Sequence, residues 1–431
     1  MALEMTSAIP GFFKLSVDER RNKVATFSNL TEEDQKTFHS LDFCLNLGTC
    51  DTMIENFITR QITPVGVATN FIVDGVDRII PYATEEPSVI AGASFAAKLA
   101  RPCGGFTTIA DPNVCTGQAV FLAPNSSPTN LKILEEHIDQ IKEVANESMP
   151  GMVQRKGGTQ SITLKEVNTE SGNMLIIEIH VAVIDSMGAN CVTKACESIK
   201  SYVQQEFGFE PLMGILTNLS TKRLVRAQGK WRISDLTCPG FDGFEVANKI
   251  IMAANLAKSE PYRAATHRKG IMNGISAVVL ATGNDVRAVE SAIHSYATLK
   301  DSNPALTNFW ISNDILIGEI VIPIPVGTVG GSINRNESVR TFRKMMKVKT
   351  ADDLARVIAA VGLAQNFAAL RALVTQGISS GHMKLHSKNI ACEAGAIGEE
   401  IDVVAEKLIQ SGSITVTTAK KILEYLHCPI T

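Results

Sequence analysis

An almost unbroken apolar run, NMLIIEIHVAVID over residues 173–185, constrains the fold of this chain more than any other segment. Only Glu178 and His180 interrupt its interior. A strand that is apolar on both faces lies in the middle of a sheet whose two faces are covered. The neighbouring patterns predict helices over residues 130–147 and 188–207 and a strand over residues 161–167. These elements together predict a compact inserted unit in which strands and helices alternate.

The sequence on either side of this unit predicts a second, larger domain. Ala- and Leu-rich helical stretches fill both flanks, and we expect them to pack as one body. Near the C-terminus, two amphipathic patterns joined by Ser-Gly-Ser predict a helical pair. The fold class we predict is α/β (α+β), with a helix-rich large domain (1–112 and 218–376), an inserted small α/β domain (113–217) and a helical C-terminal segment (377–431).

Length, charge and cysteine usage exclude several classes of protein. The chain has 431 residues, which is more than one hydrophobic core ordinarily contains, so we expect more than one domain. Its net charge of -3 provides no bulk attraction to nucleic acid. Nine cysteines without CxxC spacing are typical of reduced thiols in a cytoplasmic protein. The N-terminus lacks a secretory pattern, and the longest apolar run, from Ile315, is interrupted by Glu319 and two prolines. We therefore expect no membrane span.

The segment from Pro261 to Asp285 has the composition of an active site. It places Lys269 among glycines and Asn273, so that a polar substrate can approach the ammonium group closely. The segment then continues as an apolar run and ends on Asp285, whose carboxylate could reach the same substrate. The alternative is a solvated lysine on a loop and an aspartate that only caps the next helix.

Residues 184–190, IDSMGAN, form a second candidate site. A strand ends at Asp185 and a helix begins near Gly188, so backbone N–H groups at the helix start can face an anion such as a dinucleotide phosphate. The segment lacks GxGxxG, so it would not be a standard Rossmann site. The alternative is that Asp185 merely caps the helix that follows it.

Several segments resemble the signature sequences of one enzyme family, in family order and nearly end to end. The main matches are ATEEPSVIAGAS (83–94), IDSMGAN (184–190), the lysine segment (261–285) and GHMKLHSKNIA (381–391). Supporting matches are PVGVATNF (64–71), TNLSTKRLVRAQ (217–228), PVGTVGGS (325–332) and GLAQNFAALRALVTQGI (362–378). The chain resembles the class II 3-hydroxy-3-methylglutaryl-CoA (HMG-CoA) reductases, the soluble bacterial and archaeal kind.

This resemblance implies a role for each matching residue. The implied catalytic residues are Glu86, Lys269, Asp285 and His382. The implied substrate-binding residues are Ser88, Arg263, Asn273, Asn218 and Gln365. The implied cofactor-binding residues are Asp185, Met187, Gly188 and Asn190, to which we add Met149. The small domain would then bind the nicotinamide cofactor, and the C-terminal segment would be a flap that closes over the site.

The implied reaction reduces HMG-CoA to mevalonate and free CoA with two reduced nicotinamide cofactors. The carbonyl oxygen gains negative charge twice, and Lys269 can stabilise that charge. Glu86 must donate a proton, and a nearby Asp285 would favour the protonated acid. The departing CoA thiolate must be protonated, which suits His382 because imidazole titrates near neutral pH.

His382 and His386 could be mistaken for a zinc site, because they would share one face of a helix. No glutamate follows the first histidine, and the sequence suggests no third ligand nearby. The intervening Lys384 also suits an anion such as CoA better than a metal. We therefore predict no metal site.

The cofactor prediction depends on Met149. Degradative members of the family carry an aspartate before the proline that matches Pro150, where it would hold the ribose of NADH and repel a 2′-phosphate. Met149 removes that repulsion, and Arg155 and Lys156 could offer positive charge to a phosphate. We predict NADPH, with NADH possible. The alternative is that Met149 simply packs in a core, the basic side chains point into solvent and NADH is used.

Three other functions remain open: an NADH-linked enzyme that oxidises mevalonate, another acyl-CoA enzyme on the same scaffold, and a non-catalytic CoA-binding protein descended from a reductase. The intact set of catalytic residues disfavours the last. The resemblance also implies a homodimer, or a multiple of it, in which Glu86 and Lys269 come from different subunits. We expect HMG-CoA, mevalonate and CoA as ligands, and neither nucleic acid nor membrane as a partner.

Overall fold

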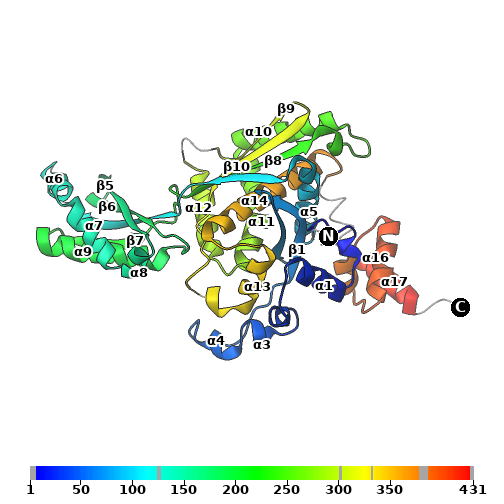
Figure 1. The fold of residues 1–431 in the computed structure, drawn as a ribbon. Coiled ribbons are helices and arrows are strands. Elements are labelled where there is room, and N and C mark those ends of the chain that lie inside the picture. The colour runs from blue at the N-terminus through cyan, green and yellow to red at the C-terminus, as the bar shows by residue number, and fades with distance from the viewer. Residues whose placement is uncertain (1–5, 124–127, 300–302, 332, 378–386, 428–431) are drawn as a thin grey trace, which may run out of the picture.

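The computed structural model describes residues 6–123, 128–299, 303–331, 333–377 and 387–427. These residues form two separate β-sheets with covering helices and a C-terminal helical pair. Figure 1 shows the smaller sheet and its helices projecting from one side of the larger body, with α16 and α17 on the opposite side. The predicted mixed α/β (α+β) class is confirmed.

The smaller sheet has the strand order β5-β6-β4-β7, and all its strands are antiparallel. Its strands are β4 (Val114–Leu122), β5 (Gly158–Thr169), β6 (Gly172–Ala182) and β7 (Pro211–Leu216). The apolar run that predicted a central strand is β6, which pairs with β5 on one side and β4 on the other. Helix α9 (Ala189–Phe207) packs on β4 and β7. The central placement predicted from the sequence is therefore confirmed.

One helix predicted in this unit is two helices. α6 (Pro128–Glu136) and α7 (Ile138–Glu147) are separated at His137, which has a non-helical backbone conformation. The ring Nδ1 of His137 donates a hydrogen bond to the carbonyl of Ile133 at 2.7 Å. The short helix α8 (Pro150–Gln154) then leads into β5.

The larger sheet was not predicted from the sequence. It has six strands in the order β2-β1-β3-β8-β10-β9, and its only parallel pair is β1 with β3 within the part of the chain that the structure describes. The strands are β1 (Val65–Val73), β2 (Val76–Ala83), β3 (Phe106–Ala110), β8 (Leu224–Arg232), β9 (Thr307–Ser312) and β10 (Ile315–Pro323). The apolar run from Ile315 is therefore the inner strand β10.

Helices from distant parts of the sequence pack with this sheet. They are α5 (Val89–Ala100), α10 (Gly243–Ser259), α11 (Pro261–Ala281), α12 (Val286–Tyr296), α13 (Glu337–Met345) and α14 (Ala351–Val374). The N-terminal helices are α1 (Val17–Phe27), α2 (Glu32–Gln35), α3 (Leu41–Cys44) and α4 (Leu47–Asp51), and the C-terminal pair is α16 (Glu400–Ser411) and α17 (Val416–His427). The Ala- and Leu-rich helical stretches predicted on both flanks and the helical pair predicted near the C-terminus are thus present.

Helix α14 forms the centre of the larger core. The ring of Phe367 stacks on Trp231 of β8 with centroids 4.0 Å apart, and the indole Nε1 donates to the carbonyl of Ala96 at 3.0 Å. α14 is long and apolar enough to cross a membrane, but two thirds of its apolar window is buried within the protein. This burial is typical of a core helix.

The larger core also encloses His267, which is 1 % exposed. Its Nε2 lies 2.8 Å from Thr307 Oγ1 and 3.1 Å from Asn366 Nδ2. Burial, with a smaller contribution from the positive charges of Arg263 and Arg268, lowers the pKa of His267 to about 3. The imidazole is therefore neutral in the folded protein at any ordinary pH.

We predict that His267 makes the protein lose stability as the pH falls from about 6.5 toward 3. In this window the unfolded chain binds a proton at His267 and the folded chain does not, so the free energy of unfolding decreases. Urea unfolding of the parent and of His267→Gln at several pH values tests this. The free energy of unfolding should change more steeply with pH in the parent than in the variant, by up to about 1.4 kcal/mol per pH unit. The control is His39→Gln, at an exposed position, whose free energy of unfolding should depend on pH as that of the parent does. The same pH dependence in the parent and in His267→Gln would contradict the prediction.

Candidate active site

Glu86 and Lys269 form an ion pair on the larger domain. Glu86 lies in the connection between β2 and α5, and its Oε2 accepts a hydrogen bond from Lys269 Nζ at 3.0 Å. Lys269 lies in the middle of α11, so the alternative that placed it on a loop is wrong. Both residues belong to one chain, so the expectation that two subunits are needed to bring them together is also wrong. The side chains are 37 % and 62 % exposed, which leaves the pair open to a ligand.

Two predicted substrate-binding residues near this pair have buried oxygens without a hydrogen-bond partner among the described residues. They are Ser88 Oγ and Gln365 Oε1. Ser88 has a left-handed backbone with φ of 74°, a conformation that a non-glycine residue adopts at a cost. It precedes α5, and the N–H of Gly92, one turn later, donates to its carbonyl at 2.8 Å. Unsatisfied polar atoms and backbone strain are features of ligand sites.

Gln365 is held close to the helices that carry the ion pair. A Cβ added to Gly92 of α5 would lie 3.8 Å from Gln365 Nε2, and one added to Gly274 of α11 would lie 3.2 Å from its Oε1. Asn273 precedes Gly274 and lies one turn after Lys269, on the same face of α11. The structure therefore brings Glu86, Lys269 and Gln365 into one region, with Ser88 and Asn273 beside it.

A cavity of about 1340 Å³ opens at this region. Glu86 and Ser88 line it, together with apolar side chains such as Phe12 and Phe38 and the basic residue Arg101. A cavity of this size with an acidic side chain at its wall can hold a large, partly apolar ligand. Arg263, at the start of α11, is half-buried, and its backbone N–H is capped by Glu260 at 2.6 Å.

The second candidate site, residues 184–190, lies between β6 and α9. Ile184 has a left-handed backbone with φ of 52°, and Gly188 has φ of 97°. A Cβ on Gly188 would lie 2.6 Å from Val183 Cγ1, so only glycine fits there. Gly188 is the N-cap residue of α9, and no side chain caps the helix there. The exposed Asn190 lies in the first turn. The N–H groups of this turn are therefore available to an anion.

Asp185 caps a helix, but not the one that follows it. Its Oδ1 accepts a hydrogen bond at 2.8 Å from the N–H of Ala351, the first residue of α14 in the larger domain. The carbonyl of Asp185 also accepts from Thr328 N at 2.8 Å, and Ser186 forms a β-bridge with Val329. The capping alternative for α9 is thus wrong, and Asp185 attaches the loop to the larger domain.

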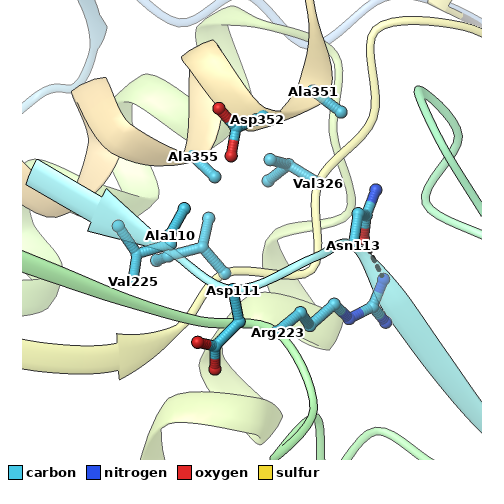
Figure 2. A pocket seen from close by; sticks show the side chains of 10 residues that line it. Ala110, Asp111, Asn113, Arg223, Val225, Val326, Ala351, Asp352 and Ala355 are labelled. Carbon is cyan, nitrogen blue, oxygen red and sulfur yellow. Dashed lines mark hydrogen bonds between the residues drawn. The ribbon is translucent and has the colours of Figure 1, made fainter. Parts of the chain in front are cut away.

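Two further residues hold this loop, and the sequence patterns did not indicate them. Asn113 Nδ2 donates to the carbonyls of Ile184 and Ser186, and Arg223 donates to the carbonyl of Met187 at 2.8 Å. Figure 2 shows the hydrogen bond that joins Arg223 to Asn113 Oδ1. The only available signal was the position of Arg223 inside TNLSTKRLVRAQ, one of the supporting segments.

Met149 packs in the core of the smaller domain. It is 5 % exposed and precedes α8. The side chain thus packs in the core, as the alternative supposed, and the assignment of position 149 to the cofactor site stays a prediction. Gln154, Arg155 and Lys156, at the end of α8, are exposed.

Asp285 lies at the far end of α11 from Lys269. It caps α12 by accepting from Ala288 N at 3.1 Å. An α-helix rises about 1.5 Å per residue, so roughly 18 Å of α11 separates Lys269 from Ala281, and Asp285 lies beyond that end. Lys269 and Asp285 of one chain therefore cannot meet.

Asp285 lies instead beside the loop of residues 184–190. The neighbouring Asn284 Oδ1 accepts from Gly327 N at 2.8 Å, and a Cβ on Gly327 would lie 2.6 Å from the backbone nitrogen of Met187. Asn218 is exposed on the connection from β7 to β8, and its carbonyl accepts from Ser220 Oγ at 3.2 Å. His382 lies outside the described residues.

Comparison with known proteins identifies the family. A family model described as hydroxymethylglutaryl-coenzyme A reductase matches residues 16–387. The chain is 45% identical over 426 residues to 3-hydroxy-3-methylglutaryl-coenzyme A reductase of Archaeoglobus fulgidus, covering 98% of this chain and 95% of that protein. It is 34% identical over 381 residues to the probable reductase of Borreliella burgdorferi, covering 87% and 84%.

Solved structures agree with these relatives. The reductase of Streptococcus pneumoniae superposes with a TM-score of 0.82 at 35% identity, covering 97% of this chain and 99% of that one. A class II reductase of the same organism, bound to NADPH in open conformations, superposes with a TM-score of 0.81 at 34% identity, covering 85% and 99%. The chain therefore belongs to the class II HMG-CoA reductases.

Proposed function

We propose that this protein reduces (S)-HMG-CoA to (R)-mevalonate and free CoA, with two molecules of NADPH. The observation that carries the proposal is the Glu86–Lys269 pair at 3.0 Å, whose Glu86 lines a large cavity and which lies near the unpartnered oxygens of Ser88 and Gln365. Family membership supports the same reaction. The product would enter isoprenoid biosynthesis through the mevalonate pathway.

The side chains near the cavity suit the two reductions. Lys269 would stabilise the negative charge that develops on the thioester carbonyl and then on the aldehyde carbonyl. Glu86, in hydrogen-bond contact with Lys269, would supply the proton to that oxygen. Ser88, Asn273 and Gln365 would orient the polar acyl group, with Arg263 and Asn218 as further contacts. His382 would protonate the departing CoA thiolate.

The loop of residues 184–190 suits the phosphates of a nicotinamide dinucleotide. The start of α9 has no side-chain cap and no acidic residue in its first turn, so its N–H groups are free of a competing anion. Met187, Gly188 and Asn190 are the residues that would hold the dinucleotide, which supplies the hydride when bound. The NADPH-bound relative supports NADPH as the reductant.

Two chains would build each complete site. In one chain, Asp185 and Asp285 lie at the end where α14 begins, whereas Lys269 and Gln365 lie toward the other end of the α11–α14 pair. About 21 Å of α14 separates Ala351 from Gln365. Hydride transfer requires reacting atoms in contact. We therefore propose a homodimer, or a multiple of it, in which Asp285 of one subunit completes the Glu86–Lys269 site of the other.

The cytoplasm would suit such an enzyme. All eight cysteines in the described part of the chain are free, and the small-molecule substrates HMG-CoA and NADPH are cytoplasmic metabolites. Neither nucleic acid nor a membrane is required as a partner. An NADH-linked enzyme that oxidises mevalonate remains the second candidate function, because its site would use the same residues.

The first test is the initial rate of NADPH oxidation by the purified protein with HMG-CoA, run in parallel with NADH. We expect HMG-CoA-dependent oxidation that is faster with NADPH. Lys269→Ala should lower kcat by about 100-fold or more, because it removes the charge that stabilises the oxyanion. A faster reaction with NADH would favour the degradative function. Absence of oxidation with either cofactor, or full activity in Lys269→Ala, would refute the proposal.

The shared site predicts that two inactive variants restore each other. We expect Lys269→Ala and Asp285→Asn to be inactive alone but to recover up to about a quarter of the parent activity when co-expressed, because each mixed dimer contains one intact site. The matched control is Glu86→Gln with Lys269→Ala. Glu86 and Lys269 meet within one chain, so this mixture should stay inactive. If the first pair also stays inactive although mixed dimers form, the shared site is wrong.

Met149→Asp tests the choice of cofactor. A carboxylate in front of Pro150 should disfavour a 2′-phosphate, so the ratio of kcat/KM for NADPH to that for NADH should fall by about tenfold. Met149→Leu keeps the packing of this buried position and serves as the control. The prediction fails if Met149→Asp folds and the ratio is unchanged.

A further inference from the structure

The loop of residues 184–187 has three of its carbonyl groups bound by two side chains. Asn113 Nδ2 donates to the carbonyl of Ile184 at 2.7 Å and to that of Ser186 at 3.1 Å. Arg223 Nη1 donates to the carbonyl of Met187 at 2.8 Å and to Asn113 Oδ1 at 3.3 Å. Asn113 and Arg223 therefore act as one hydrogen-bonded unit beneath the loop (Figure 2).

The loop needs such support because its conformation is strained. Ile184 is β-branched and has φ of 52°, a region that such residues avoid. Strained backbone persists only where the surroundings determine it. The two amide hydrogen bonds from Asn113 fall on either side of Asp185, so they hold the loop across its strained part.

Both side chains lie where the chain passes between the two sheets. Asn113 lies between β3 and β4, and Arg223 lies between β7 and β8. Arg223 is 3 % exposed, and its Nη2 contacts Ser220 Oγ at 3.3 Å. Asp111, the nearby acid in Figure 2, accepts instead from the backbone N–H of Leu224. Within the described ranges Arg223 forms no ion pair, and its Nε has no hydrogen-bond partner.

A buried cation whose charge is not neutralised by an ion pair favours an anion nearby. A carbonyl oxygen that faced a phosphate would repel it, whereas backbone N–H groups attract it. Asn113 and Arg223 donate hydrogen bonds to the carbonyl oxygens of residues 184, 186 and 187. The uncapped N–H groups at the start of α9 then remain for the ligand.

We infer that Asn113 and Arg223 are positioning residues for cofactor binding. They hold the loop carbonyls away from the dinucleotide phosphates, and Arg223 adds a buried positive charge beneath the loop. This inference rests on the proposed use of NADPH. Neither side chain needs to touch the cofactor, because both act through the backbone of residues 184–187.

The test compares NADPH binding and substrate use in purified full-length variants. In Asn113→Ala and Arg223→Met, the Kd for NADPH, measured by the change in its fluorescence, should rise by about tenfold or more, since the hydrogen bonds that hold the loop are lost. Arg223→Lys keeps the charge and should recover part of the affinity. The KM for HMG-CoA should stay within about threefold of the parent, because neither Asn113 nor Arg223 is a proposed substrate contact.

Arg226→Met is the matched control, because Arg226 is an exposed arginine on β8 whose nearest acid is Glu319 at 3.8 Å. Its Kd for NADPH should equal that of the parent. An unchanged Kd in folded Asn113→Ala and Arg223→Met overturns the inference, as does an equal loss of NADPH and HMG-CoA affinity. If Arg223→Met does not fold, Asn113→Ala decides. If the parent itself does not bind NADPH, the proposed function fails instead.

Discussion

Close packing between α11 and α14 sets the distance between the two halves of the site. A Cβ on Gly362 of α14 would lie 2.8 Å from Ile275 of α11, and one on Gly274 of α11 would lie 3.0 Å from Val361. Only glycines allow the two helices to approach this closely. The resulting pair is stiff, so the proposed substrate residues near Gln365 and the proposed cofactor loop, residues 184–190, near Ala351 stay about 21 Å apart. The proposed site would therefore need two chains to be complete.

Asp185 connects the cofactor loop to this stiff pair. Its carboxylate binds the N-terminus of α14, where the helix dipole favours a negative charge. Asn113 and Arg223 hold the same loop from the side of the smaller domain. The loop is thus fixed to both domains, and a movement of the smaller domain against the larger one must be accommodated at these contacts. In the proposed function, cofactor binding and domain orientation would be coupled through residues 184–187.

The sequence predicted the elements whose local composition is distinctive and missed the contacts between distant segments. The strand β6 and the Ala- and Leu-rich stretch that forms α14 were recognised because each is apolar over most of its length. The larger sheet was missed because the β1–β2 hairpin, β3, β8 and the β9–β10 hairpin are separated from one another by helices and by the smaller domain. The Glu86–Lys269 pair was recognised only as family residues, and its geometry within one chain was not foreseen. No local pattern indicates that Asp185 caps a helix that begins at Ala351.

The exposure of the Glu86–Lys269 pair has a consequence for catalysis. In water an ion pair contributes little, because the solvent screens both charges. Lys269 is 62 % exposed in the single chain, so its charge cannot yet act at full strength on a carbonyl oxygen. Electrostatic catalysis needs a site from which water is excluded. The second subunit that supplies Asp285 would also cover this pair, so the assembly that completes the set of catalytic residues would strengthen the field of Lys269 at the same time.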